Sequence, residues 1–212
     1  MMPRAALLAA LVAGALAAQS APKSSRIFFS KSFPGSKPEF FAVELDAGGD
    51  AVYRESADDD SPLRFQIPPA ETAEIFALAE KLRFFRRPLE SKLKVANMGM
   101  KTFRYEGGEA PAEVKFNYSE DPDARALADW FEKIGETEQH RIALERTARF
   151  DRLGVNKALL LLESSWDRKR IVAPEQLLPI LEKIAGQQNY VHIAQARAAS
   201  LAERIRAGKP QN

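Results

Sequence analysis

Glu136 and His140 are the residues whose types and spacing most directly suggest chemistry. They stand four positions apart, so on a continuous helix both side chains share one face and could bind a single metal ion. No third ligand is spaced to join them, because Glu145 falls off that face and His192 is distant in the chain. The same spacing is typical of a solvated helix with an i,i+4 contact. We therefore predict no metal site at this pair.

The densest acidic run in the chain is Asp58-Asp59-Asp60-Ser61. Clustered carboxylate oxygens are the ligands that Ca²⁺ prefers. The run lacks the alternating acidic positions and the closing glutamate of a calcium-binding loop, so we expect a polar loop between strands.

Two Ser-x-x-Lys pairs have the spacing of an acylating serine and its lysine, at Ser20/Lys23 and Ser91/Lys94. The first pair lies beside an expected cleavage site. The second lies in an expected loop, whereas an acylating pair would lie at the start of a helix. Neither pair predicts catalysis.

The composition removes several other chemistries. The chain has no Cys, which excludes thiol catalysis, Cys-based zinc sites and iron–sulfur clusters, and its two His leave little for a His-rich metal site. Gly48-Gly49 and Gly107-Gly108 lie in expected hairpin turns, so neither is a phosphate-binding loop. With 29 acidic residues, the sequence does not exclude a pair of carboxylates that hydrolyses glycosides, but no pattern in it identifies such a pair. We predict no catalytic, cofactor-binding or metal-binding residue, and we lean against an enzyme.

Basic side chains gather in two clusters. Arginine interleaved with aromatic residues can bind anions or polysaccharide, but buried Phe beside the apolar stems of Arg at a helix end is the simpler interpretation. The formal net charge is only +2, so we expect no nucleic-acid partner. The clusters are Lys81, Arg83, Arg86, Arg87, Lys92 and Lys94 around Phe84 and Phe85, and Arg146, Arg149, Arg152, Arg168, Lys169 and Arg170.

The first half of the chain has the pattern of strands and two helices. Alternating apolar residues around Gly-Gly turns predict hairpins over 40–55 and 101–118, with a further strand over 63–67. From residue 70 the apolar spacing becomes helical as far as Leu82. Asp121-Pro122 supplies an N-cap and a first-turn proline for a second helix.

The second half has the pattern of helices. We expect a helix to Phe150, then one that contains Ala158–Leu162, and two more over 174–186 and 190–205. Five consecutive apolar residues cover every side of a helix, so we expect the helix with Ala158–Leu162 to be buried between others.

The N-terminus has the pattern of a secretory signal peptide. Arg4 precedes an uncharged run, Ala5–Ala18, which is shorter than the roughly 20 residues needed to span a bilayer. Ala15-Leu16-Ala17 is an A-x-A cleavage site. A buried N-terminal helix is the alternative. We expect cleavage near Ala17/Ala18 and a mature protein without a transmembrane segment in the periplasm or outside the cell. Because the chain has no Cys, it cannot form disulfides there, and its stability must come from packing of the core.

These patterns predict an α+β protein in five parts: a signal peptide over 1–17, a polar linker over 18–25, an α+β domain over 26–135, a helical region packed on it over 136–208, and a frayed tail over 209–212. The α+β domain contains antiparallel hairpins with packed helices, and the helical region contains helical hairpins.

Two resemblances accompany these patterns. Leu177-Leu-Pro-Ile-Leu181, with Ala194, Ala198 and Leu201, resembles one HEAT-type helical hairpin, although His192 departs from the family's usual Arg. One hairpin is not an array, because solenoids need about three repeats. The mature chain also resembles a group of uncharacterised exported bacterial proteins, through residues 99–106 and 145–157. That group has no established activity, so the resemblance implies no site residue.

We therefore expect an exported, soluble, non-catalytic binding or interaction protein with an unknown protein partner. Hairpins with aromatic content can bind peptides or extend a partner's sheet. One alternative is an extracytoplasmic hydrolase that uses Asp/Glu or His. The other is a carrier of a hydrophobic or anionic ligand, which would need a cavity between sheet and helices.

Overall fold

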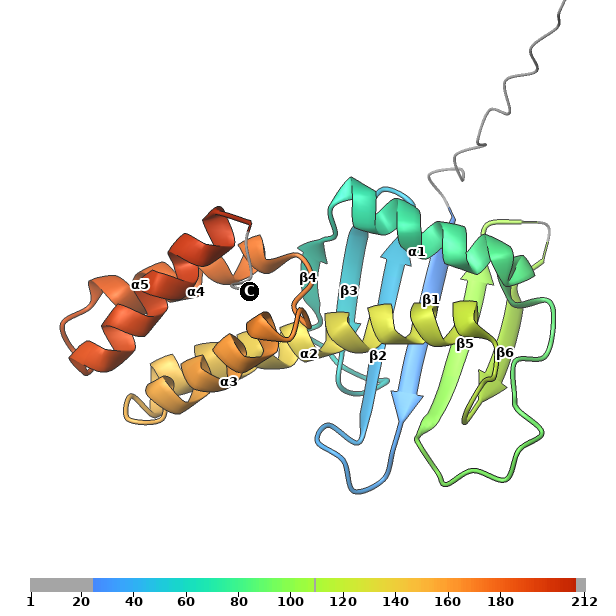
Figure 1. Ribbon diagram of the computed structural model, residues 1–212, viewed down its shortest axis with the longest axis horizontal. Helices are drawn as coiled ribbons and strands as arrows, with labels where there is room; N and C mark the ends of the chain where they lie inside the picture. The colour runs from blue at the N-terminus through green and yellow to red at the C-terminus, as the bar shows by residue number, and fades with distance from the viewer. Residues whose placement is uncertain (1–24, 109, 209–212) are drawn as a thin grey trace, which may run out of the picture.

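The computed structural model describes residues 25–108 and 110–208, and the predicted signal peptide and frayed tail lie outside them. The fold is α+β, as predicted, with one six-stranded antiparallel sheet in the order β4-β3-β2-β1-β5-β6 (Figure 1). The strands are β1 (Arg26–Ser32), β2 (Phe40–Asp46), β3 (Asp50–Arg54), β4 (Leu63–Gln66), β5 (Met100–Glu106) and β6 (Ala112–Phe116). The helices are α1 (Pro69–Lys81), α2 (Pro122–Phe150), α3 (Val155–Asp167), α4 (Leu178–Gly186) and α5 (His192–Arg206), with 3₁₀ turns η1 (Arg83–Phe85) and η2 (Pro174–Leu177).

Helices α1 and α2 cover one face of the sheet (Figure 1). The alternating apolar residues that predicted the hairpins form this covered face, since Phe41, Val43 and Leu45 of β2 are all buried. An aromatic stack joins sheet to helix, with the Phe29 ring 5.1 Å from Phe131 and 5.3 Å from Phe103 between centroids. We call β1–β6, α1 and the first half of α2 the sheet body.

The central strand β1 was not predicted as a separate strand. It pairs with both β2 and β5 over its whole length. Its adjacent Phe28 and Phe29 blur the alternation, and Lys31 faces the same side as Ile27 and Phe29. Ser25, which the sequence placed in the polar linker, is fully buried, and the Tyr105 hydroxyl donates to its oxygen at 3.1 Å.

Helix α2 runs unbroken across the boundary that the sequence predicted between the α+β domain over 26–135 and the helical region over 136–208. Asp121 caps its start as predicted, since the carboxylate accepts from the Asp123 and Ala124 amides at 2.9 and 3.3 Å. A Cβ on Gly135 would lie 2.7 Å from the Phe41 ring. The glycine therefore lets helix and sheet approach closely, and the expected boundary between 135 and 136 lies inside a continuous helix.

The second half of α2 and α3–α5 form a separate hydrophobic core, which we call the helical arm. Helices α4 and α5 pack against each other near the predicted bounds, with Ala194, Ala198 and Leu201 buried. The expected burial of α3 on all sides is wrong, because α3 packs on α2 and α5 and leaves Leu160 and Leu161 exposed. In the part of the chain that the structure describes, no helix combines the length and the apolar character that crossing a membrane requires.

Candidate functional site

A cavity of about 290 Å³ lies between the β1–β2 loop and α2. Glu132, Glu136 and Gln139 recur on one side of α2 because they are spaced by about a helical turn. The loop over 33–39 forms the opposite wall. The lining residues are Lys31, Phe33, Ser36, Lys37, Pro38, Glu39, Phe41, Glu132, Glu136, Gln139 and Arg170.

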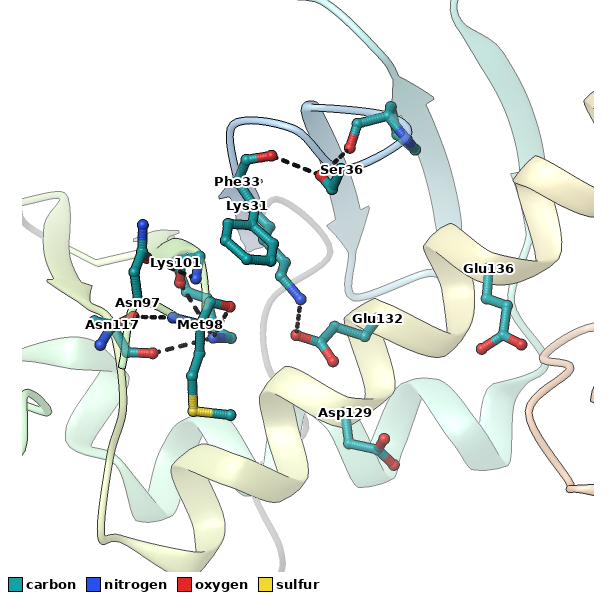
Figure 2. A network of polar contacts seen from close by, with 12 residues as sticks. Lys31, Phe33, Ser36, Asn97, Met98, Lys101, Asn117, Asp129, Glu132 and Glu136 are labelled. Carbon is teal, nitrogen blue, oxygen red and sulfur yellow. Dashed lines mark hydrogen bonds and ion pairs between the residues drawn. The ribbon is translucent and has the colours of Figure 1, made fainter. Parts of the chain in front are cut away.

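The loop wall is held by its own hydrogen bonds. The Ser36 hydroxyl lies 2.7 Å from the Phe33 carbonyl oxygen and 2.6 Å from that of Pro38 (Figure 2). The Phe33 amide donates to the Glu39 carbonyl at 2.8 Å, and Gly35, at a φ of 84°, lets its amide reach the Glu39 carboxylate. Contacts within the loop therefore fix the shape of this wall of the cavity.

Two lysines point inward where the sheet's apolar face ends. Lys31 of β1 and Lys101 of β5 are direct cross-strand partners, a like-charge pair that ordinarily destabilises a sheet. Lys31 Nζ lies 2.8 Å from Glu132 Oε1, and Figure 2 shows it pointing at that carboxylate, with Glu136 one turn further along α2. Lys31 thus contributes a fixed ion pair to the cavity wall.

Lys101 is almost fully buried and has no carboxylate contact within the described residues. Its ammonium instead donates to the carbonyl oxygens of Gly99 and Asn117 at 3.2 and 3.1 Å (Figure 2). Burial lowers the pKa of Lys101. The sequence analysis did not identify either lysine. The signal was present, because each lysine continues the alternation of Ile27 and Phe29 or of Phe103 and so lies on the same face of its strand as these buried residues.

Glu136 and His140 do lie together, as their spacing predicted, but Ser165 of α3 joins them. The serine hydroxyl donates to Glu136 Oε1 at 2.6 Å, and His140 Nε2 lies 2.9 Å from the serine oxygen. Because the one hydroxyl proton goes to the carboxylate, the imidazole must donate to the serine and cannot act as its base. Ser165 is also buried, so this arrangement offers no nucleophile.

Arg170 closes the same cluster from the segment after α3. Its guanidinium donates to Glu136 Oε2 at 2.8 Å and also to Asp129. Burial alone would raise the pKa of Glu136, but the hydrogen bonds from Ser165 and Arg170 outweigh it and lower that pKa. Burial lowers the pKa of His140, which favours a neutral ring. Among the described residues, no group of three potential ligands is placed to hold a metal ion.

The other sequence candidates stay apart from the cavity. Asp59 accepts from the Ser61 amide at 2.9 Å in an exposed turn. Ser91 donates to Glu120 at 2.9 Å rather than approaching Lys94. Ser20 and Lys23 lie outside the described residues.

The remaining histidine and the first basic cluster also lie elsewhere. His192 is exposed, and its Nδ1 lies 3.2 Å from Gln195. In the basic cluster after α1, Phe85 is buried and Phe84 stacks on Tyr105 with 4.3 Å between ring centroids. These Phe side chains therefore serve the core, as the simpler interpretation held.

A wider groove of about 710 Å³ continues from the cavity along α2. The two hollows share Lys37, Pro38 and Gln139, so they form one path beside the helix, which we call the α2 groove. Among the described residues, neither Lys37 nor Arg146 has a carboxylate within ion-pair distance. The rest of the wider part is lined by Glu55, Ile142, Ala143, Arg146, Thr147, Phe150 and Asp151.

No protein-family model and no curated protein matches this chain. Its function must therefore be inferred from the geometry of the molecule.

Proposed function

We propose that the protein is an exported, non-catalytic binding protein whose α2 groove takes an extended segment of a partner protein. The observation that carries this proposal is the groove itself, whose wider part is lined by apolar side chains such as Ile142 and Phe150, by the cations Lys37 and Arg146, and by the acids Glu55 and Asp151. Because neither Lys37 nor Arg146 has an ion-pair partner among the described residues, a segment with apolar side chains and an acidic side chain placed beside these two cations is complementary to the lining. Export rests on the N-terminal sequence pattern alone.

The side chains with catalytic chemistry support a binding role because they are occupied by one another. Ser165, His140, Glu136 and Arg170 form a closed set of hydrogen bonds. Glu138 has a pKa raised by burial to about 7, as a general acid would need, but it is fully buried and does not line the cavity. A hydrolase is therefore the weaker alternative.

A carrier of a hydrophobic ligand fits the cavity less well. Its walls carry the ion pairs of Lys31 with Glu132 and of Arg170 with Glu136, whereas apolar carriers need few polar groups. An anionic small molecule would have to compete with these carboxylates. The extended shape of the α2 groove favours a peptide segment over either.

A photoreactive benzophenone side chain tests the groove directly. Placed at Ala143 of the full chain and irradiated in the source cells, it should give one dominant protein adduct, identified by mass spectrometry. Ala199, an exposed alanine of α5, is the matched control and should not give that adduct. Adding Arg146→Glu to the Ala143 variant should remove the adduct by charge repulsion.

Two outcomes would contradict the proposal. The same adducts from Ala143 and Ala199 would show non-specific contact rather than a binding groove. Hydrolysis of a generic ester, glycoside or phosphate panel by the purified chain, lost in a Glu136→Gln variant, would establish the alternative of an enzyme.

A further inference from the structure

The turn between α2 and α3 exposes a group of large apolar side chains. Phe150 is 75% exposed and Leu153 is 83% exposed, while Leu160 and Leu161 on the outer side of α3 are 44% and 55% exposed. Single exposed apolar residues are ordinary, but a group of four within twelve positions is a mark of an interaction surface. We call residues 149–161 the α2–α3 tip.

The cations of this tip lack acidic partners in the described part of the chain. Arg149, Arg152 and Lys157 are exposed, and within the described residues none of them lies within 4.0 Å of a carboxylate, the limit for an ion pair. Elsewhere in the helical arm, Arg197 and Arg204 are both paired to Glu163, at 3.0 and 3.1 Å. Among the described residues, unpaired cations are therefore gathered at the tip and next to it, where Arg146 of α2 also lacks a partner.

The acid within the tip is engaged in the turn itself. Asp151 Oδ1 accepts from the Gly154 amide at 3.0 Å, which fixes the turn before α3. Arg149 lies over the Phe150 ring at 5.1 Å from its centroid. Cationic and apolar groups thus occupy the same exposed surface, with one carboxylate among three cations.

The shape of this end of the molecule identifies the kind of partner. In Figure 1 the turn lies at the end of the helical arm remote from the sheet, beside the α4–α5 turn. The Tyr190 hydroxyl donates to the Ala148 carbonyl at 3.0 Å, which holds the two turns together, and exposed Val191 and Ile193 extend the apolar area. An exposed apolar end bordered by cations suits an anionic surface with an apolar interior.

We propose that the α2–α3 tip docks on an anionic lipid bilayer. The apolar side chains would enter the boundary between headgroups and acyl chains, and Arg149, Arg152 and Lys157 would meet lipid phosphates. Phe150 and Asp151 belong to both the tip and the α2 groove, but the variants that test the tip, at Leu153, Arg149 and Arg152, leave every residue that lines the groove unchanged.

The absence of native Cys makes a site-specific test possible. A Leu153→Cys variant of the full chain carries one environment-sensitive fluorophore and is mixed with vesicles of phosphatidylcholine containing about 30% phosphatidylglycerol. We expect its emission to shift to the blue and rise severalfold, and to respond little to pure phosphatidylcholine. A Leu93→Cys label is the matched control, since Leu93 is also exposed and flanked by Lys92 and Lys94.

The local readout separates the tip from any binding by the N-terminal apolar run, which would leave the label at position 153 in water. Arg149→Gln with Arg152→Gln should weaken the response about 25-fold, since each cation near an anionic surface contributes roughly a factor of five. Lys92→Gln with Lys94→Gln should leave it unchanged. Raising the salt from about 0.1 M to about 1 M should reverse binding.

Three results would overturn the proposal. An unchanged spectrum of the label at position 153 with anionic vesicles excludes docking. An equal response of the label at position 93 excludes the tip as the docking surface. A response that depends on protein concentration without vesicles, with a dimer in sedimentation velocity, identifies the tip as a contact between two copies instead.

Discussion

The sheet body and the helical arm differ in where they place charged side chains and their most exposed apolar side chains. The sheet body turns charge inward, where Lys31 and Lys101 stand at the edge of its apolar face and are held by Glu132 and by carbonyl oxygens. The helical arm turns apolar side chains outward, as Leu153 and Leu161 show. The body therefore contributes a polar wall to the cavity, and the arm leaves Phe150 and Leu153 highly exposed at the α2–α3 tip.

The two regions meet within α2, where the helix buries polar groups instead of apolar ones. Along α2, the buried apolar positions of the sheet body's core end at Ile134, and those of the helical arm's core begin at Leu144. Between them lie buried Thr137 and Glu138. Thr137 Oγ1 accepts from the Val172 amide at 3.0 Å, so the segment after α3 is fastened to this junction.

The largest difference between the two regions should be in the stability that a single apolar side chain contributes. Phe131→Ala should lower the free energy of unfolding by about 3–5 kcal/mol, because the ring is fully buried and stacked on Phe29. Leu153→Ala should change it by less than about 0.5 kcal/mol, because that side chain is solvated. Urea titration followed by circular dichroism measures both. A large loss from Leu153→Ala would mean that the tip supports the fold rather than an interaction.

The junction should give the next largest effect, and it depends on pH. Neither carboxylate oxygen of Glu138 has a hydrogen-bond partner among the described residues, and Arg141 lies 3.6 Å away. Burial raises the pKa of Glu138 from 4.5 to about 7, so the folded state holds a proton that the unfolded chain releases. This contribution to stability is complete below pH 4.5 and is lost as the pH rises through about 7.

Glu138→Gln removes that titration. At about pH 8 the variant should be more stable than the native protein by roughly 3 kcal/mol, and near pH 4.5 the two should be equal. His140, whose pKa burial lowers, contributes the opposite slope, but it is present in both proteins and cancels in their difference. Urea titrations across this pH range measure the difference. A constant offset would show that Glu138 is ionised in the folded state.

The continuity of α2 predicts a smaller effect at Gly135. Alanine is the better helix former by roughly 1 kcal/mol, yet its Cβ would lie 2.7 Å from the Phe41 ring. We expect Gly135→Ala to destabilise the protein by about 1–2 kcal/mol, because the clash of the added Cβ with the Phe41 ring costs more than the better helix propensity of alanine gains. Gly186→Ala in α4 is the matched control, with no described atom within 4 Å of the added carbon, and should be neutral or stabilising. A stabilising Gly135→Ala would mean that helix and sheet move apart freely.

The sequence pattern predicts those strands and helices that bury a single face, because their apolar residues then recur with the period of a strand or of a helix. The hairpin strands β2 and β3, the start of α2 at its Asp121 cap, and the bounds of α4 and α5 follow from alternation, capping and helical spacing. The exposure of Leu160 does not follow, because a run of apolar residues carries no information on how many neighbours surround a helix. Tertiary placement decides that exposure.

The candidate site was less predictable than the fold. Helical spacing correctly paired Glu136 with His140, but Ser165 lies 29 residues from Glu136 and only the packing of α3 on α2 brings it there. The pairing of Lys31 with Lys101 required the register of two strands 70 residues apart. Neither feature could be predicted from the sequence, because the residues that form it lie far apart in the chain.

The smallest effect compares one ion pair from each region. Lys31–Glu132 in the cavity wall has side chains only 23% and 29% exposed, whereas Arg206–Glu182 in the helical arm has both at 52%. Water screens the second pair more strongly, so a double-mutant cycle should give a coupling of about 1 kcal/mol for the first and a few tenths for the second. Lys31→Met, Glu132→Gln, Arg206→Met and Glu182→Gln, with their double variants, complete the two cycles. Equal couplings would show that the cavity is as solvated as the outer surface and would remove the polar, positioned character that distinguishes the sheet body.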